Sequence, residues 1–201
     1  MTDPLPPTTR KTSSDEAIDA AWVDGAPRHD RPVTIVDYDP AWPGLYAREE
    51  ARIRSILGER VVRIDHTGST SVPGLAAKPQ IDITMVVPDS ADERAYVPDL
   101  EAAGYKLVIR EPEWFEHRLF KGPDTEVNLH VFSVGCPEVA RMLGFSDHLR
   151  ADPADRELYA RTKRQLAARR WKYVQHYANA KADVVAEIMA RTGLGLRNGC
   201  G

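Results

Sequence analysis

The chain has little cysteine and no long run of apolar residues. Cys136 and Cys200 are the two cysteines among 201 residues, and they form no C-x-x-C pair. A disulfide framework and a cysteine-based zinc site are therefore not expected. No stretch approaches the roughly 18 apolar residues of a membrane-spanning helix, and the N-terminal segment has no apolar signal core. These absences predict a protein of the reducing cytoplasm that enters no membrane.

The chain also lacks a large excess of charge of either sign. Its formal net charge is −3, with 28% charged and 42% apolar residues. Because this balance gives no general attraction to phosphate backbones, nucleic acid is not an expected partner. The length and the share of apolar residues suit one folded domain with a full core.

Composition divides the chain into three parts. Residues 1–32 are rich in Pro, Thr, Ser, Asp and Ala with few large apolar side chains, so we expect a flexible N-terminal arm. Within this arm, Ser14–Trp22 is compatible with one short capped helix. Residues 33–192 are expected to form the folded domain, and the glycine-rich residues 193–201 a flexible tail.

Hydrophobic periodicity predicts an α/β domain built on a small mixed sheet. Strands are expected at residues 33–36, 60–66, 80–87, 105–110, 115–121 and 126–134. Helices are expected at residues 40–57 and 89–103, and then from Pro137 onward with breaks near 152–153 and 170. This order predicts helices covering one side of the sheet, followed by a C-terminal helical set.

The segment from His66 to Ile83 is the most informative in the chain. It contains a Gly68-Ser69 turn followed by further hydroxyl residues, and such a turn lets backbone N–H groups approach a phosphate closely. It ends with Asp82 inside an apolar strand, where a carboxylate is costly unless it is paired or holds a cation. Lys78 lies between the turn and the acid and could meet phosphate oxygens, although a surface lysine is an equal alternative.

Strand alternation places further polar residues beside this acid. Asp82 shares a strand face with its neighbours two positions away, and in the later strand Glu126, Asn128 and His130 share a face. If the two strands are neighbours, Asp82, Glu126 and His130 converge on one cation, and carboxylate ligands suit Mg²⁺ with phosphate completing its shell. The alternative is an ordinary solvated sheet face.

Two lysines of the C-terminal helices stand four residues after a tyrosine and so share a helix face with it. These pairs are Tyr159 with Lys163 and Tyr177 with Lys181. Such faces could close over a nucleotide, whereas most basic helix faces are merely solvated. His66, at the end of its strand, either touches substrate or caps the strand.

These motifs together resemble the GrpB family, over about residues 33–192. The resemblance is carried by Tyr38-x-x-x-Trp42, His66–Pro79, Ile81–Ile83, Leu129–Phe132, Phe145-x-Asp147-x-Leu149-Arg150, Lys163 and Tyr177-x-x-x-Lys181. It implies a nucleotidyltransferase-type fold and magnesium-dependent attack on a nucleoside triphosphate. The superfamily pattern has two acids flanking one apolar residue, whereas this chain has one, so Glu126 or His130 would have to stand in.

The leading hypothesis is therefore a GrpB-type enzyme that uses Mg²⁺ and a nucleoside triphosphate, in first place ATP, on a small-molecule acceptor. The reaction would be nucleotidyl transfer, or activation of a carboxylate that ends in an amide. Asp82 and Glu126 would bind metal, and His130, His66 and Asp82 would be catalytic. The nucleotide would be held by Gly68, Ser69, Thr70, Lys78, Lys163 and Lys181. The alternatives are a non-catalytic nucleotide-binding module and a single-metal phosphohydrolase built on His66, Asp82 and His130.

Overall fold

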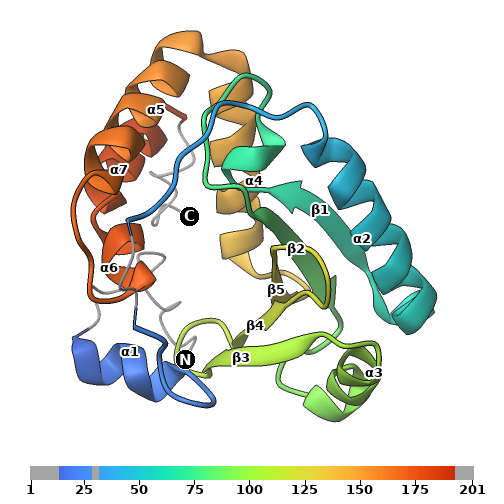
Figure 1. Ribbon diagram of the computed structural model, residues 1–201. Helices are drawn as coiled ribbons and strands as arrows, with labels where there is room; N and C mark the ends of the chain where they lie inside the picture. The colour runs from blue at the N-terminus through green and yellow to red at the C-terminus, as the bar shows by residue number, and fades with distance from the viewer. Residues whose placement is uncertain (1–13, 29–31, 193–201) are drawn as a thin grey trace, which may run out of the picture.

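The computed structural model describes residues 14–28 and 32–192, and its centre is one five-stranded sheet with the order β1-β2-β5-β4-β3. The strands are β1 (Arg63–Thr67), β2 (Ile81–Val87), β3 (Lys106–Glu111), β4 (His117–Lys121) and β5 (Val127–Ser133). Helices lie to both sides of this sheet, with the C-terminal helices gathered on one side (Figure 1). The sheet is mixed, as the sequence predicts.

The central strands β2 and β5 are parallel, and every other pairing in the sheet is antiparallel. Parallel pairing brings the first residues of β2 and β5 to the same edge, so that Asp82 lies opposite Asn128 and Thr84 opposite His130. On the other side of β2, Thr67 at the end of β1 lies opposite Asp82. The turn that follows β1 therefore begins beside Asp82.

One face of the sheet is covered by α2 (Trp42–Leu57) and α3 (Val97–Ala102). Alternate residues of the central strands, such as Ile83 and Leu129, point to this face and are fully buried together with Ile53 of α2. Each such side chain contributes about 1.5–3 kcal/mol by leaving water. Two short 3₁₀ segments, η1 (Gly58–Arg60) and η3 (Glu93–Ala95), follow α2 and precede α3.

The other face carries the C-terminal helices. These are α4 (Pro137–Ala151), α5 (Pro153–Ala167), α6 (Val174–Asn179) and α7 (Ala182–Thr192). Val139 of α4 packs on Val86 and Phe132, which makes that end of the face apolar. The opposite end of the same face carries Asp82 and Asn128 and is polar. Asp152 separates α4 from α5 because its side chain caps the first turn of α5.

Most of the predicted elements are confirmed, and three regions differ, one of them by an additional break between α6 and α7 at residues 180–181. Residues 33–36 form a single bridge between Val36 and Ala77 instead of a strand. Extending this antiparallel bridge over residues 33–36 would include Pro79, which has no N–H to donate. The helix expected at 89–103 is split into η3 and α3. Pro98 lies in the first turn of α3, where its missing N–H costs nothing, and it would break a longer helix.

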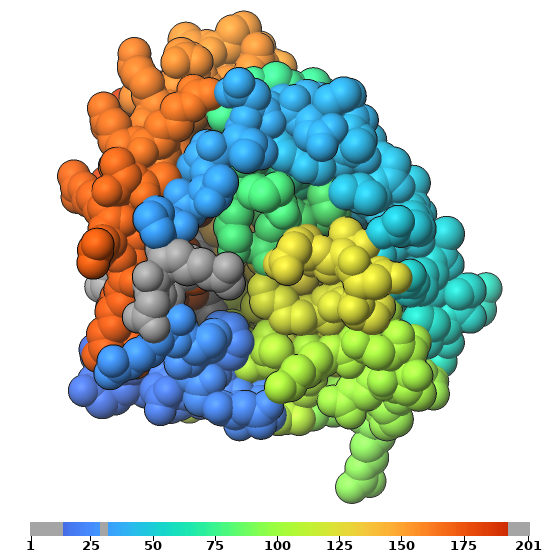
Figure 2. Space-filling view, in the orientation of Figure 1, coloured from blue at the N-terminus to red at the C-terminus, as the bar shows by residue number. Residues whose placement is uncertain are grey.

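The segment Asp15–Ala21 forms the helix α1, capped by Ser14, whose Oγ accepts a hydrogen bond from the N–H of Ala17 at 3.3 Å. Ile18 is buried, and Trp22 forms a bridge with Ile109 of β3. Figure 2 shows this segment (blue) between the C-terminal helices (orange) and the strands β3 and β4 (yellow-green). The predicted arm thus contains a helix that packs on the domain.

The boundaries of the predicted arm and tail stay predictions. Residues 1–13, 29–31 and 193–201 lie outside the described residues. Within residues 14–28 and 32–192, none of the helices has the length and the apolar character needed to cross a membrane.

Candidate functional site

The turn after β1 packs directly against Asp82. Gly68 has a φ of 68°, and the 3₁₀ segment η2 (Ser69–Ser71) follows it. A Cβ atom on Gly68 would lie 2.9 Å from Cβ and 3.0 Å from Cγ of Asp82. Only glycine combines this backbone conformation with so close an approach. The carboxylate of Asp82 and the serine-bearing turn therefore face one another.

Side chains on other elements hold this turn in place. Ser71 Oγ donates to the carbonyl of Gly68 at 2.8 Å. Arg150 of α4 donates to the carbonyl of Ser71 at 3.1 Å and to its Oγ at 2.9 Å. Thr70 Oγ1 donates to the carbonyl of Gln80 at 3.1 Å. These contacts preorganise the turn before any ligand arrives.

Asn128 orients the carboxylate of Asp82. Its Nδ2 donates to Asp82 Oδ1 at 2.8 Å, while its Oδ1 accepts from Lys121 Nζ at 2.6 Å and from Gln80 Nε2 at 3.1 Å. Because a lysine only donates, the amide orientation of Asn128 is determined. Oδ2 of Asp82 is the carboxylate oxygen on the side of Gly68. Burial raises the pKa of Asp82, and the hydrogen bond from Asn128 acts in the opposite direction.

Four lysines surround this one carboxylate. The positive charges of Lys181, Lys121 and Lys78 each favour the ionised form of Asp82. Lys163, 2% exposed, donates from Nζ to Ser69 Oγ at 2.9 Å and to the carbonyl of Ala76. Burial, with the charge of Lys181, lowers the pKa of Lys163 to about 6, so it is mostly uncharged at neutral pH. A group of positive charges of this kind would attract an anion.

Both expected tyrosine–lysine contacts are formed, but only Tyr159 and Lys163 share a helix, because Lys181 lies in the turn between α6 and α7. Nζ of Lys163 lies 4.6 Å from the ring centroid of Tyr159 in α5, and Nζ of Lys181 lies 4.8 Å from that of Tyr177 in α6. Burial raises the pKa of Tyr159 to about 12. The hydroxyl of Tyr177 is buried and has no hydrogen-bond partner among the described residues.

His130 lies on the same face of β5 as Asn128, two residues farther along the strand. Its Nδ1 is 3.0 Å from Nε2 of His117 in β4. Glu126 is exposed just before β5 begins, and its carbonyl accepts the N–H of Ile81 at 2.8 Å. Among the residues predicted to hold a metal, Asp82 is the one that faces the turn.

His66 contacts the turn through Thr70, from the face of the sheet that α2 covers. His66 lies opposite Ile83, on the face covered by α2, where its ring stacks on Tyr46 at 4.8 Å. Its Nε2 is 3.1 Å from Thr70 Oγ1. Burial and the charge of Arg150 lower the pKa of His66 to about 4, so its ring is uncharged at neutral pH. The structure therefore separates His66 from Asp82, on opposite faces of the sheet.

Sequence reasoning missed Lys121 and the full role of Asn128. Alternation along β5 puts Asn128 on the Asp82 face, which was a usable signal. Lys121 reaches Asn128 because the two residues lie opposite one another in the pairing of β4 with β5.

The residues fit a magnesium ion that arrives with a phosphate. One carboxylate oxygen faces the turn, and Mg²⁺ commonly takes one or two carboxylates and completes its shell with phosphate oxygens and water. A group of three potential ligands in the described chain, His148, Asp152 and Asp155, lies at the junction of α4 and α5. There Asp155 is already paired with His148 at 2.7 Å and with Arg191, so that cluster is internally satisfied.

Comparisons with known proteins agree with this architecture. The family model described as GrpB protein matches residues 32–191. UPF0157 protein BH1888 of Halalkalibacterium halodurans is 56% identical over 191 residues, which cover 93% of this chain and 98% of that protein. A dephospho-CoA kinase of Mycolicibacterium paratuberculosis is 32% identical over 69% of this chain, and the match spans 40% of the kinase.

The solved structures include a relative with the same fold. The crystal structure of the conserved protein GrpB from Enterococcus faecalis superposes with a TM-score of 0.70 at 28% identity, covering 79% of this chain and 96% of that one. The match to the family model spans most of the chain, and the Halalkalibacterium protein matches nearly its whole length. The chain belongs to the GrpB family.

Proposed function

We propose that the protein binds a nucleoside triphosphate with Mg²⁺ at the Gly68 turn and transfers its nucleotidyl group to a small-molecule acceptor. The observation that carries the proposal is the single carboxylate of Asp82, packed against the turn and ringed by four lysines. A triphosphate carries several negative charges, which this cluster matches. ATP is the nucleotide we expect first.

Each group has a part in binding. Lys78, Lys121 and Lys181 offset the charge of the phosphates, and the Gly68 turn offers backbone N–H groups. Asp82 would hold Mg²⁺ together with phosphate oxygens, and the ion would stabilise the charge that develops on the departing pyrophosphate. Lys163 bonds Ser69 and reaches the same turn, so an arriving anion would favour its protonated form.

A second candidate function is nucleotide binding without turnover. The observation that favours it is the number of acids at the turn. Among the residues that the structure describes, Asp82 is the carboxylate that faces the turn, and Asn128 and Gln80 occupy the neighbouring positions. The single-metal phosphohydrolase is less favoured, since His66 and His130 do not share a face of the sheet.

The first experiment combines binding and turnover. Thermal unfolding is followed with nucleoside triphosphates, with and without Mg²⁺, and pyrophosphate release is then measured with pooled alcohols, amines and carboxylic acids. We expect the wild type to be stabilised by a triphosphate and to release pyrophosphate. Asp82→Asn should lower the turnover by about 100-fold or more, in the range seen when one charge-stabilising group is removed.

Asp65→Asn is the matched control. Asp65 is a carboxylate on the neighbouring strand whose charge is already met by Arg63 at 2.6 Å, so this variant should retain binding and turnover. Stabilisation by nucleotide without pyrophosphate release from any acceptor would support the binding module instead. No stabilisation by any triphosphate would refute both functions.

A further inference from the structure

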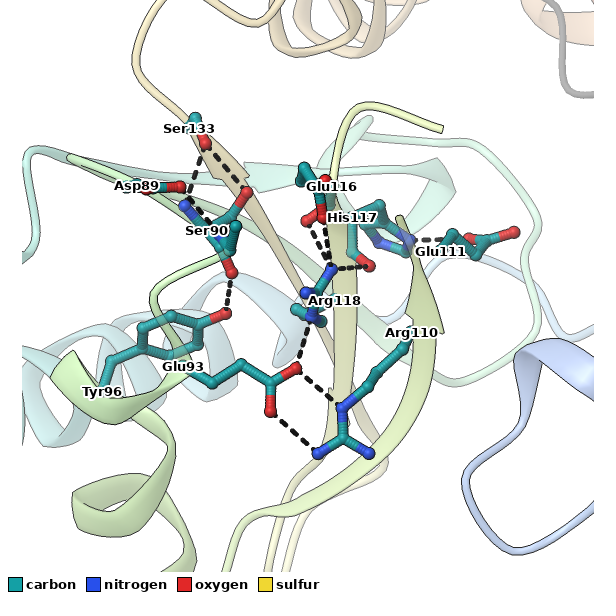
Figure 3. Close-up of polar contacts among 11 residues, drawn as sticks. Asp89, Ser90, Glu93, Tyr96, Arg110, Glu111, Glu116, His117, Arg118 and Ser133 are labelled. Atoms are coloured by element: carbon teal, nitrogen blue, oxygen red, sulfur yellow. Dashed lines mark hydrogen bonds and ion pairs between the residues drawn. The ribbon is translucent and has the colours of Figure 1, made fainter. Parts of the chain in front are cut away.

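Glu111, His117 and His130 form a hydrogen-bonded chain across three neighbouring strands. Oε2 of Glu111 is 2.8 Å from Nδ1 of His117, and Nε2 of His117 is 3.0 Å from Nδ1 of His130. Glu111 and His117 are directly opposite one another in the pairing of β3 with β4, and Figure 3 shows the contact between their side chains. His117 is 1% exposed. The chain therefore runs through the interior of the sheet toward His130.

The direction of the hydrogen bonds follows from the carboxylate. An ionised Glu111 only accepts, so Nδ1 of His117 carries a proton. When His117 is neutral it accepts at Nε2, and the proton in the next bond then belongs to Nδ1 of His130. In neutral His130 the lone pair is consequently on Nε2, the nitrogen that can take a proton.

Aromatic packing holds His117, the middle residue of this hydrogen-bonded series, in place. The ring of Trp114 meets that of His117 edge-on at 5.2 Å, and Phe132 stacks on His117 at 4.8 Å. The turn just before His117 contains two non-glycine residues with positive φ, Phe115 at 54° and Glu116 at 50°. Each such residue costs of order 1–3 kcal/mol, and such strain clusters at functional sites.

His130, the last residue of the hydrogen-bonded series, lies beside the candidate nucleotide site. His130 follows Asn128 by two positions on the same face of β5, which is a separation of about 6.5 Å along a strand. Asn128 in turn holds Asp82 at 2.8 Å. Thr84, which lies opposite His130, is on the same face. A group attacking a phosphate held at Asp82 would pass close to His130.

We propose that Glu111 and His117 are positioning residues that make His130 the general base, and that the acceptor therefore attacks through an O–H or N–H group. This inference rests on the proposed function. In the step, the acceptor oxygen or nitrogen bonds to the α-phosphorus, the bond from that phosphorus to the bridging oxygen breaks, and pyrophosphate leaves. The acceptor proton passes to Nε2 of His130. A carboxylate acceptor has no proton to lose in this step and needs no such base.

The ring nitrogens of His130 can be tested without any turnover. In ¹⁵N-labelled protein, long-range ¹H–¹⁵N spectra identify which nitrogen of a neutral histidine is protonated. We expect the Nδ1–H form for His130 in the wild type, with the signal assigned by its loss in His130→Gln. In His117→Phe, which keeps an aromatic ring in place, His130 should revert to the Nε2–H form that neutral imidazoles ordinarily prefer.

Kinetics test the consequence for the reaction. His117→Phe and Glu111→Gln should lower kcat for pyrophosphate release with an alcohol or amine by about 100-fold or more, the scale of general base catalysis. Stabilisation by the Mg²⁺–triphosphate and its KM should stay unchanged. Glu116→Gln, in the same turn but paired with Arg118 at 3.4 Å, is the matched control and should retain wild-type kcat. Glu111→Gln serves alone if His117→Phe does not fold.

Several outcomes would overturn the inference. An Nε2–H form of His130 in the wild type contradicts the direction of the hydrogen bonds. A tautomer of His130 that is the same in the wild type, His117→Phe and Glu111→Gln contradicts it as well. Equal kcat values in all variants contradict the positioning role, and turnover of carboxylic acids alone contradicts the acceptor class. If no acceptor reacts, the proposed function and this step both fail, whereas a failure confined to the histidine variants leaves nucleotide binding at Asp82 intact.

Discussion

Two clusters of charge in this molecule are built in opposite ways. Glu93 accepts from Arg110 at 2.7 and 2.8 Å and from Arg118 at 2.7 Å (Figure 3). These arginines lower the pKa of Glu93, Arg110 first, with burial acting in the opposite direction. Asp82 accepts one hydrogen bond from the neutral amide of Asn128, and burial raises its pKa.

The difference separates a structural cluster from the cluster that we propose binds a nucleotide. Arg118 also contacts the carboxylate of Glu116 at 3.4 Å, so the groups around Glu93 satisfy one another and join η3 to β3 and β4. Around Asp82 the lysines outnumber the acid, and Lys163 stays mostly uncharged because burial makes its charge costly. Substitutions in the Glu93 cluster should therefore lower the free energy of unfolding, and substitutions in the Asp82 cluster should mainly affect ligand binding.

Removing the acid of the structural cluster should have the larger effect on stability. Glu93→Gln leaves Arg118, with 7% of its side chain exposed, without its main partner, and we expect the free energy of unfolding to fall by about 3 kcal/mol. Denaturant unfolding at pH 7 measures this change. Asp82→Asn, measured in the same way, should leave stability unchanged or increased, because it removes a buried charge that has no ionic partner as close as those of Glu93.

The pH dependence of this effect has a definite sign. The pKa of Glu93 is lower in the folded protein than its ordinary value of 4.5, so its contribution is fully present above pH 4.5 and is lost as the pH falls through the folded pKa. The difference between wild type and Glu93→Gln should therefore shrink below pH 4.5. A difference that is constant between pH 3 and pH 7 would contradict the assignment.

The close approach at Gly68 can be tested against a second glycine of the same loop. Gly68→Ala introduces a Cβ atom 2.9 Å from Asp82 Cβ, whereas Gly74, with φ of 77°, has nothing within 4 Å of its added Cβ. Both variants incur backbone strain of about 1 kcal/mol, and Gly68→Ala should lose about 2 kcal/mol more through overpacking. Equal losses in the two variants would mean that the turn and the acid are not packed as described.

Nucleotide binding by Gly68→Ala and Gly74→Ala should differ as well. Displacement of the turn in Gly68→Ala should abolish stabilisation by a Mg²⁺–triphosphate in the thermal unfolding assay. Gly74→Ala should retain it, because the loop there is open.

Of these substitutions, the one at Lys163 should change the free energy of unfolding least and the uptake of protons most. Its pKa is about 6 in the folded protein and about 10.5 for an ordinary lysine. Between these values the unfolded chain binds a proton that the folded protein does not, so stability rises with pH across this interval. Lys163→Met should raise the free energy of unfolding at pH 7 by about 1 kcal/mol and flatten this dependence, as denaturant unfolding between pH 6 and pH 9 would measure.

The same residue should take up a proton when an anion binds. Calorimetry of triphosphate binding at pH 7, in buffers of different ionisation enthalpy, should give different heats for the wild type and equal heats for Lys163→Met. Equal heats for the wild type would argue against an uncharged Lys163 in the free protein.

Local patterns in the sequence predicted the parts of the site that depend on a few consecutive residues. Alternation along residues 80–86 put Asp82 on a polar face, because successive strand residues point to opposite sides. The spacing of Tyr159 and Lys163 predicted a shared helix face, because residues four apart are neighbours on a helix. Both predictions are confirmed, and so is the break at Asp152 and Pro153.

By itself, then, the sequence determined most of the elements, the family resemblance and the turn with its acid. The tertiary structure decided which polar residues meet. The parallel pairing of β2 with β5 put Asn128, and not Glu126, opposite Asp82, and the pairing of β4 with both neighbours joined His117 to Glu111 and His130. Strand order and register depend on contacts between segments far apart in the chain, so a residue's local surroundings do not reveal its partner across the sheet.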